Sequence, residues 1–168
     1  EDTLYFYYAG HGVPDRNNNQ YTYLLPVDGE MSSAEDERLE MGKLYNMMAQ
    51  SNAKHITAFV DACFSGQAER GKMVFEGIAG IKMQRRININ EERLTLFSAG
   101  KNDQYANQYK AKGHRLFSYY LIRGLLEGKR DLTSLKEYVA TQVLTDSRRM
   151  AGADEQTPEV IGSLDRNI

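Results

Sequence analysis

Two apolar runs without alternation constrain the fold more than any other feature of the chain. Residues 3–9 read Thr-Leu-Tyr-Phe-Tyr-Tyr-Ala, and residues 55–61 read His-Ile-Thr-Ala-Phe-Val-Asp. Such runs, rich in aromatic and β-branched residues, are typical of strands that are buried on both faces of a sheet. A third run, residues 94–99, fits the same description. Strands of this kind occur mainly in parallel sheets that helices cover on both sides.

Helical patterns separate and follow these runs. Apolar residues recur at helical spacing over 39–50, 116–127 and 132–150, and a short strand is expected over 21–25. We expect Thr133 to cap the last of these helices. Strands that alternate with helices predict an α/β domain, a three-layer sandwich with a mostly parallel sheet between helices.

Composition excludes several classes of function. The chain has 168 residues, the usual length of one domain, with 41% hydrophobic and 26% charged residues. A net charge of −2 gives no electrostatic reason to expect binding to nucleic acid or to a membrane. No apolar stretch has the ~20 residues of a membrane helix. A single cysteine excludes an internal disulfide, so we expect a cytoplasmic protein, with secretion left open.

A histidine and the only cysteine follow the first two apolar runs. His11 lies between Gly10 and Gly12, and Cys63 stands two residues after Asp61. The carboxyl ends of neighbouring parallel strands meet at one edge of the sheet, where binding sites form. A thiolate is a strong nucleophile, and a nearby imidazole can take its proton and later protonate a leaving amine. We therefore predict a catalytic dyad, with the backbone N–H groups of Gly12 and Cys63 as candidate donors to an oxyanion.

Each of the two residues also has a simpler explanation. A lone cysteine is most often a small buried hydrophobe, and a histidine between glycines is most often a turn residue. The combination favours catalysis, because both residues follow strands and both lie near glycines. His114, which follows Gly113, is a weaker alternative to His11, and His55 is expected to be structural.

Two motifs resemble those of a known family. Residues 8–12, Tyr-Ala-Gly-His-Gly, are similar to the histidine motif of caspase-like cysteine peptidases of clan CD. Residues 61–66, Asp-Ala-Cys-Phe-Ser-Gly, resemble the nucleophile motif of their metacaspase branch. Further stretches resemble later parts of bacterial caspase homologues: 96–100, 113–121 and 156–158. The resemblance implies a caspase-like fold in which Cys63 is the nucleophile and His11 the general base.

The chain departs from this family at its beginning. Caspase-like domains usually have two strands and two helices before the histidine strand, and here that strand comes first. A serine commonly stands two residues before the histidine, where this chain has Ala9. We therefore expect residues 1–168 to be the C-terminal portion of a peptidase domain. Either a second polypeptide supplies the first strands, or the chain is a product of processing.

Asp61 is the residue expected to select the substrate. A carboxylate at a strand end can pair with a cationic side chain, and the resemblance implies cleavage after Arg or Lys. The alternative is that Asp61 accepts backbone N–H bonds in the turn after its strand. Ser98, in the stretch 96–100, and Asp103, in a segment similar to the Asp-Asp-Gln segment of metacaspases, are further substrate-binding candidates. A solvated loop position explains Asp103 equally well.

Two polar stretches carry further expectations. Residues 67–93 are expected to form a surface loop in which an Arg/Lys-directed enzyme finds sites for self-cleavage: Arg70, Lys72, Lys82, Arg85 and Arg86. A solvated charged loop is the alternative. The sequence requires no cofactor and has no zinc spacing, but some metacaspases require calcium, and five acidic residues are candidates to bind it: Asp28, Glu30, Glu35, Asp36 and Glu37. These residues do not follow the EF-hand pattern, and a solvated acidic face is favoured.

The leading hypothesis is a cysteine endopeptidase that cuts protein or peptide substrates after Arg or Lys and processes itself from a zymogen. A caspase-like interaction module that acts by binding a partner is the alternative from another class. A cysteine-dependent transpeptidase or ligase is a third possibility, because it shares the acyl-enzyme and differs only in the acceptor.

Overall fold

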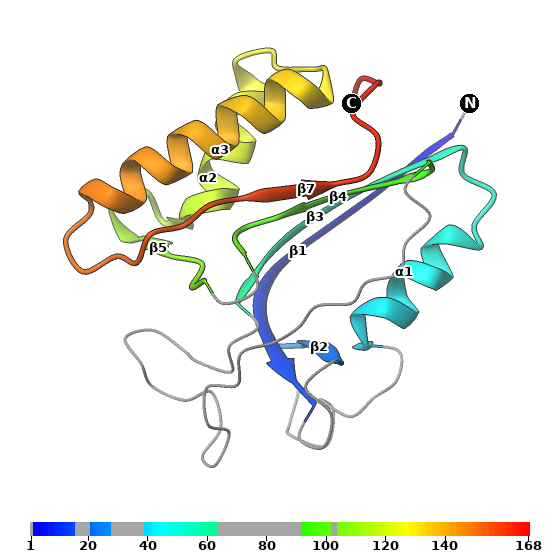
Figure 1. Ribbon diagram of the computed structural model, residues 1–168, viewed down its shortest axis with the longest axis horizontal. Coiled ribbons are helices and arrows are strands. Elements are labelled where there is room, and N and C mark those ends of the chain that lie inside the picture. The colour runs from blue at the N-terminus through cyan, green and yellow to red at the C-terminus, as the bar shows by residue number, and fades with distance from the viewer. Residues whose placement is uncertain (1, 16–20, 28–38, 64–91, 102–103) are drawn as a thin grey trace.

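The computed structural model describes residues 2–15, 21–27, 39–63, 92–101 and 104–168, and five of the strands in these residues form a central sheet. Figure 1 shows its strands in the order β2-β1-β3-β4-β7. Their bounds are Thr3–Pro14 for β1, Thr22–Leu25 for β2, His55–Cys63 for β3, Leu94–Ser98 for β4 and Glu159–Ile161 for β7. The three central strands β1, β3 and β4 are parallel, whereas β2 and β7 run antiparallel to their neighbours. The predicted α/β architecture is confirmed.

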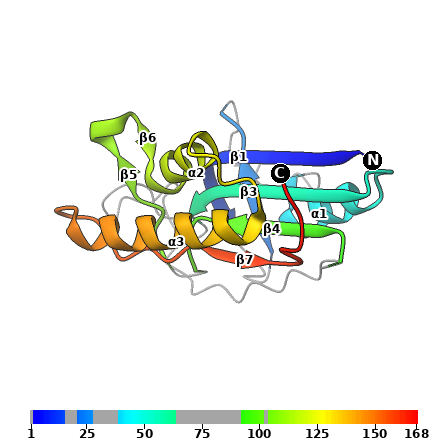
Figure 2. The same ribbon diagram turned by 90° about the horizontal axis from the view of Figure 1, so that it is seen from above.

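Helices cover both faces of the sheet, which gives the three predicted layers (Figures 1 and 2). On one face lies α1 (Met41–Ala49), and on the other lie α2 (Leu116–Leu126) and α3 (Leu132–Arg149). All three helices begin and end within two residues of the predicted bounds. The cap of α3 is Asp131, whose carboxylate accepts a hydrogen bond from the Ser134 N–H, so the prediction of Thr133 as the cap is wrong.

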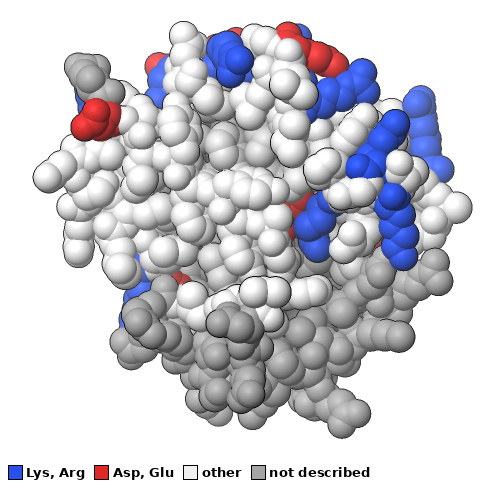
Figure 3. Space-filling view, turned by 180° about the vertical axis from the view of Figure 1, so that it is seen from behind, with Lys and Arg blue, Asp and Glu red and all other residues white. Residues whose placement is uncertain are grey.

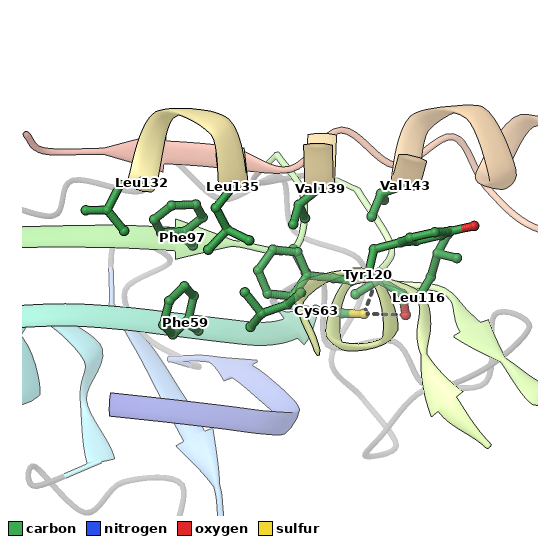
Figure 4. Packing of buried hydrophobic residues seen from close by; sticks show 13 residues of the cluster. Phe59, Cys63, Phe97, Leu116, Tyr120, Leu132, Leu135, Val139 and Val143 are labelled. Carbon is green, nitrogen blue, oxygen red and sulfur yellow. Dashed lines mark hydrogen bonds between the residues drawn. The ribbon is translucent and has the colours of Figure 1, made fainter. Parts of the chain in front are cut away.

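The side chains of β3 divide between two hydrophobic clusters. Successive residues of a strand point to opposite faces, so Phe59 and Cys63 pack in the cluster beneath α2 and α3 (Figure 4). Ala58 and Val60 pack on the other face with residues of α1. Both faces of β3 are therefore covered, as its unbroken apolar run predicts.

β1 differs from the prediction in both length and burial. It continues to Pro14, because residues 11–14 pair with β2, and so it includes His11. Only one of its faces is covered along most of its length: Tyr5 and Tyr7 are 49% and 52% exposed. The described part of the α2–α3 cluster contains residues of β3 and β4 but none of β1. Seen from behind, on the β1 side of the sheet, the molecule has a broad area without charged side chains (Figure 3).

A small second sheet leads into α2. It consists of β5 (Gln108–Tyr109) and β6 (His114–Arg115), joined by a short 3-10 helix, Lys110–Lys112. Gly113 reverses the chain at φ 68°, a left-handed conformation that glycine adopts without steric cost. The turn places Arg115 directly before α2, as its N-cap residue. In the described part of the chain, no helix is both long enough and apolar enough to cross a membrane.

Candidate active site

The register of β1 and β3 brings His11 and Cys63 together. The two residues are direct partners in the parallel pair. The backbones of adjacent strands lie about 4.8 Å apart, and the side chains of two register partners point to the same face of the sheet. Both lie inside the strands rather than beyond them, as β3 ends at Cys63 and β1 continues past His11. Their proximity therefore follows from the hydrogen-bonded ladder itself.

Cys63 is enclosed by the core. Its side chain is 3% exposed and lies at the end of the cluster beneath α2 and α3 (Figure 4). The Ala106 N–H donates to Sγ at 2.9 Å, the thiol lies 3.7 Å from the Ala106 carbonyl, and Arg115 Nη2 donates to Sγ at 3.5 Å. Burial raises the pKa of the Cys63 thiol above its ordinary value of 9.0, although the positive charge of Arg115 opposes this rise. At neutral pH the thiol thus needs a base to remove its proton.

His11 lies on the more open strand. Its side chain is exposed, and its ring nitrogens form no hydrogen bond with Sγ or with any other described residue. Partial burial and the nearby charge of Arg115 lower the pKa of the imidazole below 6.5. At pH 7 the ring is therefore neutral, which is the form that a general base requires. Catalytic hydrogen bonds are often long or absent until a substrate binds.

The carboxylate of Asp61 is already fully engaged. It is 0% exposed and accepts bonds from Arg115 Nε at 3.0 Å, from the Ser118 N–H at 3.0 Å and from the Ser118 hydroxyl at 2.6 Å. Ser118 lies in the first turn of α2, whose N-cap Arg115 forms no side-chain capping bond. Asp61 therefore satisfies an N–H group that the helix leaves free, and its negative charge suits the helix N-terminus.

These hydrogen bonds have to be compared with the prediction that Asp61 binds a cationic side chain of the substrate. A backbone N–H bond is what the alternative interpretation expected, although the donor belongs to α2 and not to the turn after β3. Because the carboxylate is buried and bonded to Arg115 and Ser118, a substrate cation would have to displace one of these contacts to reach it. The role of Asp61 in substrate binding stays a prediction.

Arg115 and Ser118 are the site residues that sequence reasoning missed. The guanidinium of Arg115 contacts the carboxylate of Asp61, the sulfur of Cys63 and the carbonyl of Ala106, the last at 3.0 Å. Arg115 lies 52 residues after Cys63 in the sequence. The only local signal is a basic residue directly before a helix, and that signal does not identify a partner.

The other predicted site residues lie elsewhere or are not described. Gly12 is buried in β1 opposite Leu24, and its N–H as an oxyanion donor, like that of Cys63, stays a prediction. Ser98 is buried at the end of β4, and its hydroxyl donates to the Glu159 carbonyl at 3.4 Å. Asp103 lies outside the described residues, as do the five acidic candidates for calcium and all of 67–93 except its last two residues. No described group of three or more His, Cys, Asp or Glu side chains is placed to hold a metal ion.

The two remaining histidines are not near the thiol. His55 begins β3, at the opposite end from Cys63, and its Nδ1 lies 3.4 Å from Arg166 Nη1. His114 precedes Arg115 in β6, and successive side chains of a strand point in opposite directions. Because Arg115 points toward Sγ, His114 points away from it. The geometry therefore favours His11 as the partner of Cys63.

Comparisons with known proteins agree with this layout. A family model described as the caspase domain matches residues 1–168. A protein of Geobacter sulfurreducens has a similar structure, with 20% identity and a TM-score of 0.61, over 98% of this chain and 67% of that one. Caspase-1 of Spodoptera frugiperda is similar with 14% identity and a TM-score of 0.55, over 99% of this chain and 62% of that one. The chain thus spans about two thirds of the length of these structures. No curated protein sequence matches it.

Proposed function

Because the chain belongs to the caspase-domain family, we propose that it is a cysteine endopeptidase in which Cys63 is the nucleophile and His11 the general base. The observation that carries the proposal is the register of β1 and β3, which makes these two residues direct partners. The family consists of cysteine peptidases, and the chain has a thiol and an imidazole on one face at one end of its sheet. A chain that acted only by binding would need neither group.

The proposed reaction is acyl transfer. His11 takes the proton of the thiol while Sγ attacks the carbonyl carbon of the scissile peptide, and the N–H groups of Gly12 and Cys63 stabilise the oxyanion. The C–N bond then breaks, and the proton passes from His11 to the leaving amine. Water attacks the resulting thioester with His11 as base. Its hydroxyl stays on the new carboxylic acid, and the sulfur regains a proton.

The directions of the two pKa shifts support a neutral thiol–imidazole pair as the resting state. Burial raises the pKa of Cys63, and burial together with Arg115 lowers that of His11, so neither group is charged near pH 7. The ratio kcat/KM should therefore rise as the pH increases through the lowered pKa of His11, which lies below 6.5. A pH–rate profile measured between pH 4 and 8 checks this, and an acid limb centred above 6.5 would contradict it.

The proposal includes cleavage after Arg or Lys. It is supported by the resemblance of residues 61–66 to the metacaspase motif. It is also supported by the contact between Asp61 and the guanidinium of Arg115 at 3.0 Å, because the same carboxylate would bind a substrate guanidinium once Arg115 moves aside. Ser98 and Asp103 are proposed as further residues of this pocket.

Fluorogenic peptides that end in Arg, Lys, Asp or Asn test the reaction and the preference together, with and without calcium. We expect hydrolysis after Arg and Lys, and a loss of about 10⁴–10⁶-fold in kcat for Cys63→Ala and a large loss for His11→Ala. His114→Ala is the matched control and should keep its activity. Activity that survives Cys63→Ala would overturn the nucleophile, and hydrolysis of Asp peptides alone would overturn the preference.

Self-cleavage is part of the same proposal. Residues 67–93 contain six basic residues, and the first five of them are the proposed cleavage sites for an Arg/Lys-directed enzyme. Cleavage there would make the intact chain a zymogen. Intact-mass spectrometry of the active chain beside Cys63→Ala tests this. We expect fragments that end at a basic residue in the active chain alone. Identical full-length masses in both chains would contradict self-cleavage.

A second polypeptide is proposed to complete the domain on the β1 side. Tyr5 and Tyr7 expose about half of their surface there, and the face seen in Figure 3 has a broad area without charged side chains. The two similar structures are also longer than this chain. Gel filtration of the chain alone, combined with the peptide assay, tests the need for a partner. If the chain elutes as a monomer and this monomer hydrolyses the Arg and Lys peptides, no partner is needed for activity.

A further inference from the structure

We propose that Arg115 stabilises the thiolate of Cys63 by direct contact, and that Asp61 is the positioning residue that holds its guanidinium in place. The inference deepens the proposed function, since it concerns the same nucleophile. It is carried by a contact that no sequence motif predicts, in which one largely buried guanidinium reaches both the sulfur and a carboxylate two residues away along β3.

The guanidinium donates hydrogen bonds to three groups. Nε donates to the Asp61 carboxylate at 3.0 Å, whereas Nη2 donates to Sγ at 3.5 Å and to the Ala106 carbonyl at 3.0 Å. The side chain of Arg115 is 12% exposed and that of Asp61 is 0% exposed, so water screens these contacts weakly. A hydrogen bond from a charged donor strengthens as negative charge develops on its acceptor. The contact with Sγ is therefore strongest when the thiol has lost its proton.

Two sets of contacts keep Arg115 where it is. The first is the carboxylate of Asp61, which also binds both the N–H and the hydroxyl of Ser118 in the first turn of α2. The second is the pairing of β6 with β5, in which Arg115 lies opposite Gln108. A single carboxylate therefore fixes the guanidinium and the start of the helix that follows it, which keeps Arg115 beside Sγ as long as no substrate cation takes its place at Asp61.

The charges around Sγ define what Arg115 must counteract. Burial raises the pKa of Cys63 and the negative charge of Asp61 adds to the rise, whereas Arg115 lowers it through its charge and its hydrogen bond. On the neighbouring strand β1, His11 faces the same site, and Arg115 lowers its pKa as well. Removing the charge of Arg115 should therefore raise both values. If a substrate guanidinium replaces Arg115 at Asp61, it brings an equivalent charge to the same place.

The pH dependence of alkylation by iodoacetamide tests the proposal without any substrate. Cys63 is the only cysteine, so intact mass reports its reaction alone. For Arg115→Met, we expect the midpoint of the rate profile to rise by about one pH unit or more, as for a charge within hydrogen-bond distance. Arg115→Lys should stay near the wild-type midpoint. The matched control is Arg123→Met, which removes the same charge from an exposed pair with Glu127 on α2 and should leave the midpoint unchanged.

A second variant keeps the test valid if Arg115→Met does not fold. Arg115→Met leaves the buried carboxylate of Asp61 without its ion pair, so Asp61→Asn/Arg115→Met, which removes both charges, is measured beside it. Circular dichroism checks that each variant is folded. An upward shift in whichever of these variants folds supports the proposal. The shift should be smaller in the double variant, because that variant also loses the charge of Asp61, which raises the pKa of Cys63. A folded variant whose midpoint does not rise overturns the proposal. Because alkylation needs no catalysis, a shifted midpoint would keep the role of Arg115 even where the peptide assay rejects the proposed function.

Discussion

β1 and β3 are neighbours in one sheet and hold the two candidate catalytic residues, yet their surroundings differ. Eight of the nine residues of β3 are buried, whereas only three of the twelve in β1 are, and these three are paired with β2. The sulfur of Cys63 contacts Ala106 and Arg115, while the ring of His11 has no hydrogen-bond partner among the described residues. The proposed nucleophile is thus part of the hydrophobic core, and the proposed base lies on a strand with one open face.

This contrast suggests a division of labour within the site. A thiol fixed by packing and hydrogen bonds keeps its position without a substrate, whereas an exposed imidazole can turn to the thiol when a substrate excludes water. Substitutions that affect stability should therefore concentrate on β3.

The largest difference is expected between Phe59 and Tyr7, which are register partners on the same face of the sheet. Phe59 is 6% exposed and packs against Phe97 with ring centroids 5.1 Å apart. Phe59→Ala should lower the free energy of unfolding by about 3–5 kcal/mol. Tyr7→Ala should cost less than about 1.5 kcal/mol, because half of its surface is already in water. Urea denaturation measures both, and equal losses would show that the face of β1 is covered in solution.

The second difference concerns pH, since Cys63 and His11 should destabilise the fold at opposite ends of the scale. The folded state raises the pKa of Cys63, so its contribution is intact below 9.0 and is lost as the pH rises through the raised value. The folded state lowers the pKa of His11, so its contribution is present above 6.5 and is lost as the pH falls through the lowered value. For either group, a tenfold change in its acid dissociation constant on folding corresponds to about 1.4 kcal/mol.

The measurement is the free energy of unfolding against pH for the wild type, Cys63→Ala and His11→Ala. Cys63→Ala should lose less stability than the wild type above pH 9, and His11→Ala should lose less below pH 6.5. Curves that run parallel to the wild type would show that neither pKa changes on folding. Taking differences between variants removes the contributions of the tyrosines, which also titrate at high pH.

A smaller effect is expected at the one polar contact of β1 with α2. The hydroxyl of Tyr7 lies 2.7 Å from the Ser118 Oγ, which itself donates to Asp61. Tyr7→Phe removes that contact and should cost about 0.5–1.5 kcal/mol, toward the lower end because the ring is half exposed. Thermal unfolding of Tyr7→Phe beside Tyr5→Phe, which removes a hydroxyl from the same exposed face, measures it. A loss well above this range would indicate that Tyr7 positions Ser118 for Asp61.

The smallest effect is expected at Tyr5, which is 49% exposed. Tyr5→Thr keeps a residue that favours strands and should change the free energy of unfolding by no more than about 0.5 kcal/mol. The same urea titration measures it. A loss of several kcal/mol would mean that another polypeptide or a second copy covers β1, and would remove the contrast between the two strands.

The sequence predicted the central strands, the three long helices and the pairing of His11 with Cys63, because each depends on local patterns. A continuous apolar run identifies a strand, and parallel strands bring their carboxyl ends together. The same pattern wrongly predicted that both faces of β1 are buried, because a Tyr-rich run has the same sequence pattern whether one or both of its faces are covered. Only the arrangement of helices decides that.

Short strands and pairs of residues far apart in the sequence could not be predicted, because neither has a local pattern. β5, β6 and β7 have two or three residues each, too few to show a period. Asp61 and Arg115 are 54 residues apart in the sequence, and the residues around each of them do not indicate the other as its partner. The sequence therefore predicted that Cys63 and His11 lie side by side but not that the guanidinium of Arg115 lies next to the sulfur.

The direct pairing of His11 with Cys63 also has a consequence for how such a chain can vary over evolution. Side chains alternate between the two faces along a strand, so deleting or inserting one residue within 3–10 or 55–62 would turn one member of the pair to the opposite face. Point substitutions in these segments leave that relation intact. Length, more than chemical identity, should therefore be the inherited property of these two strands.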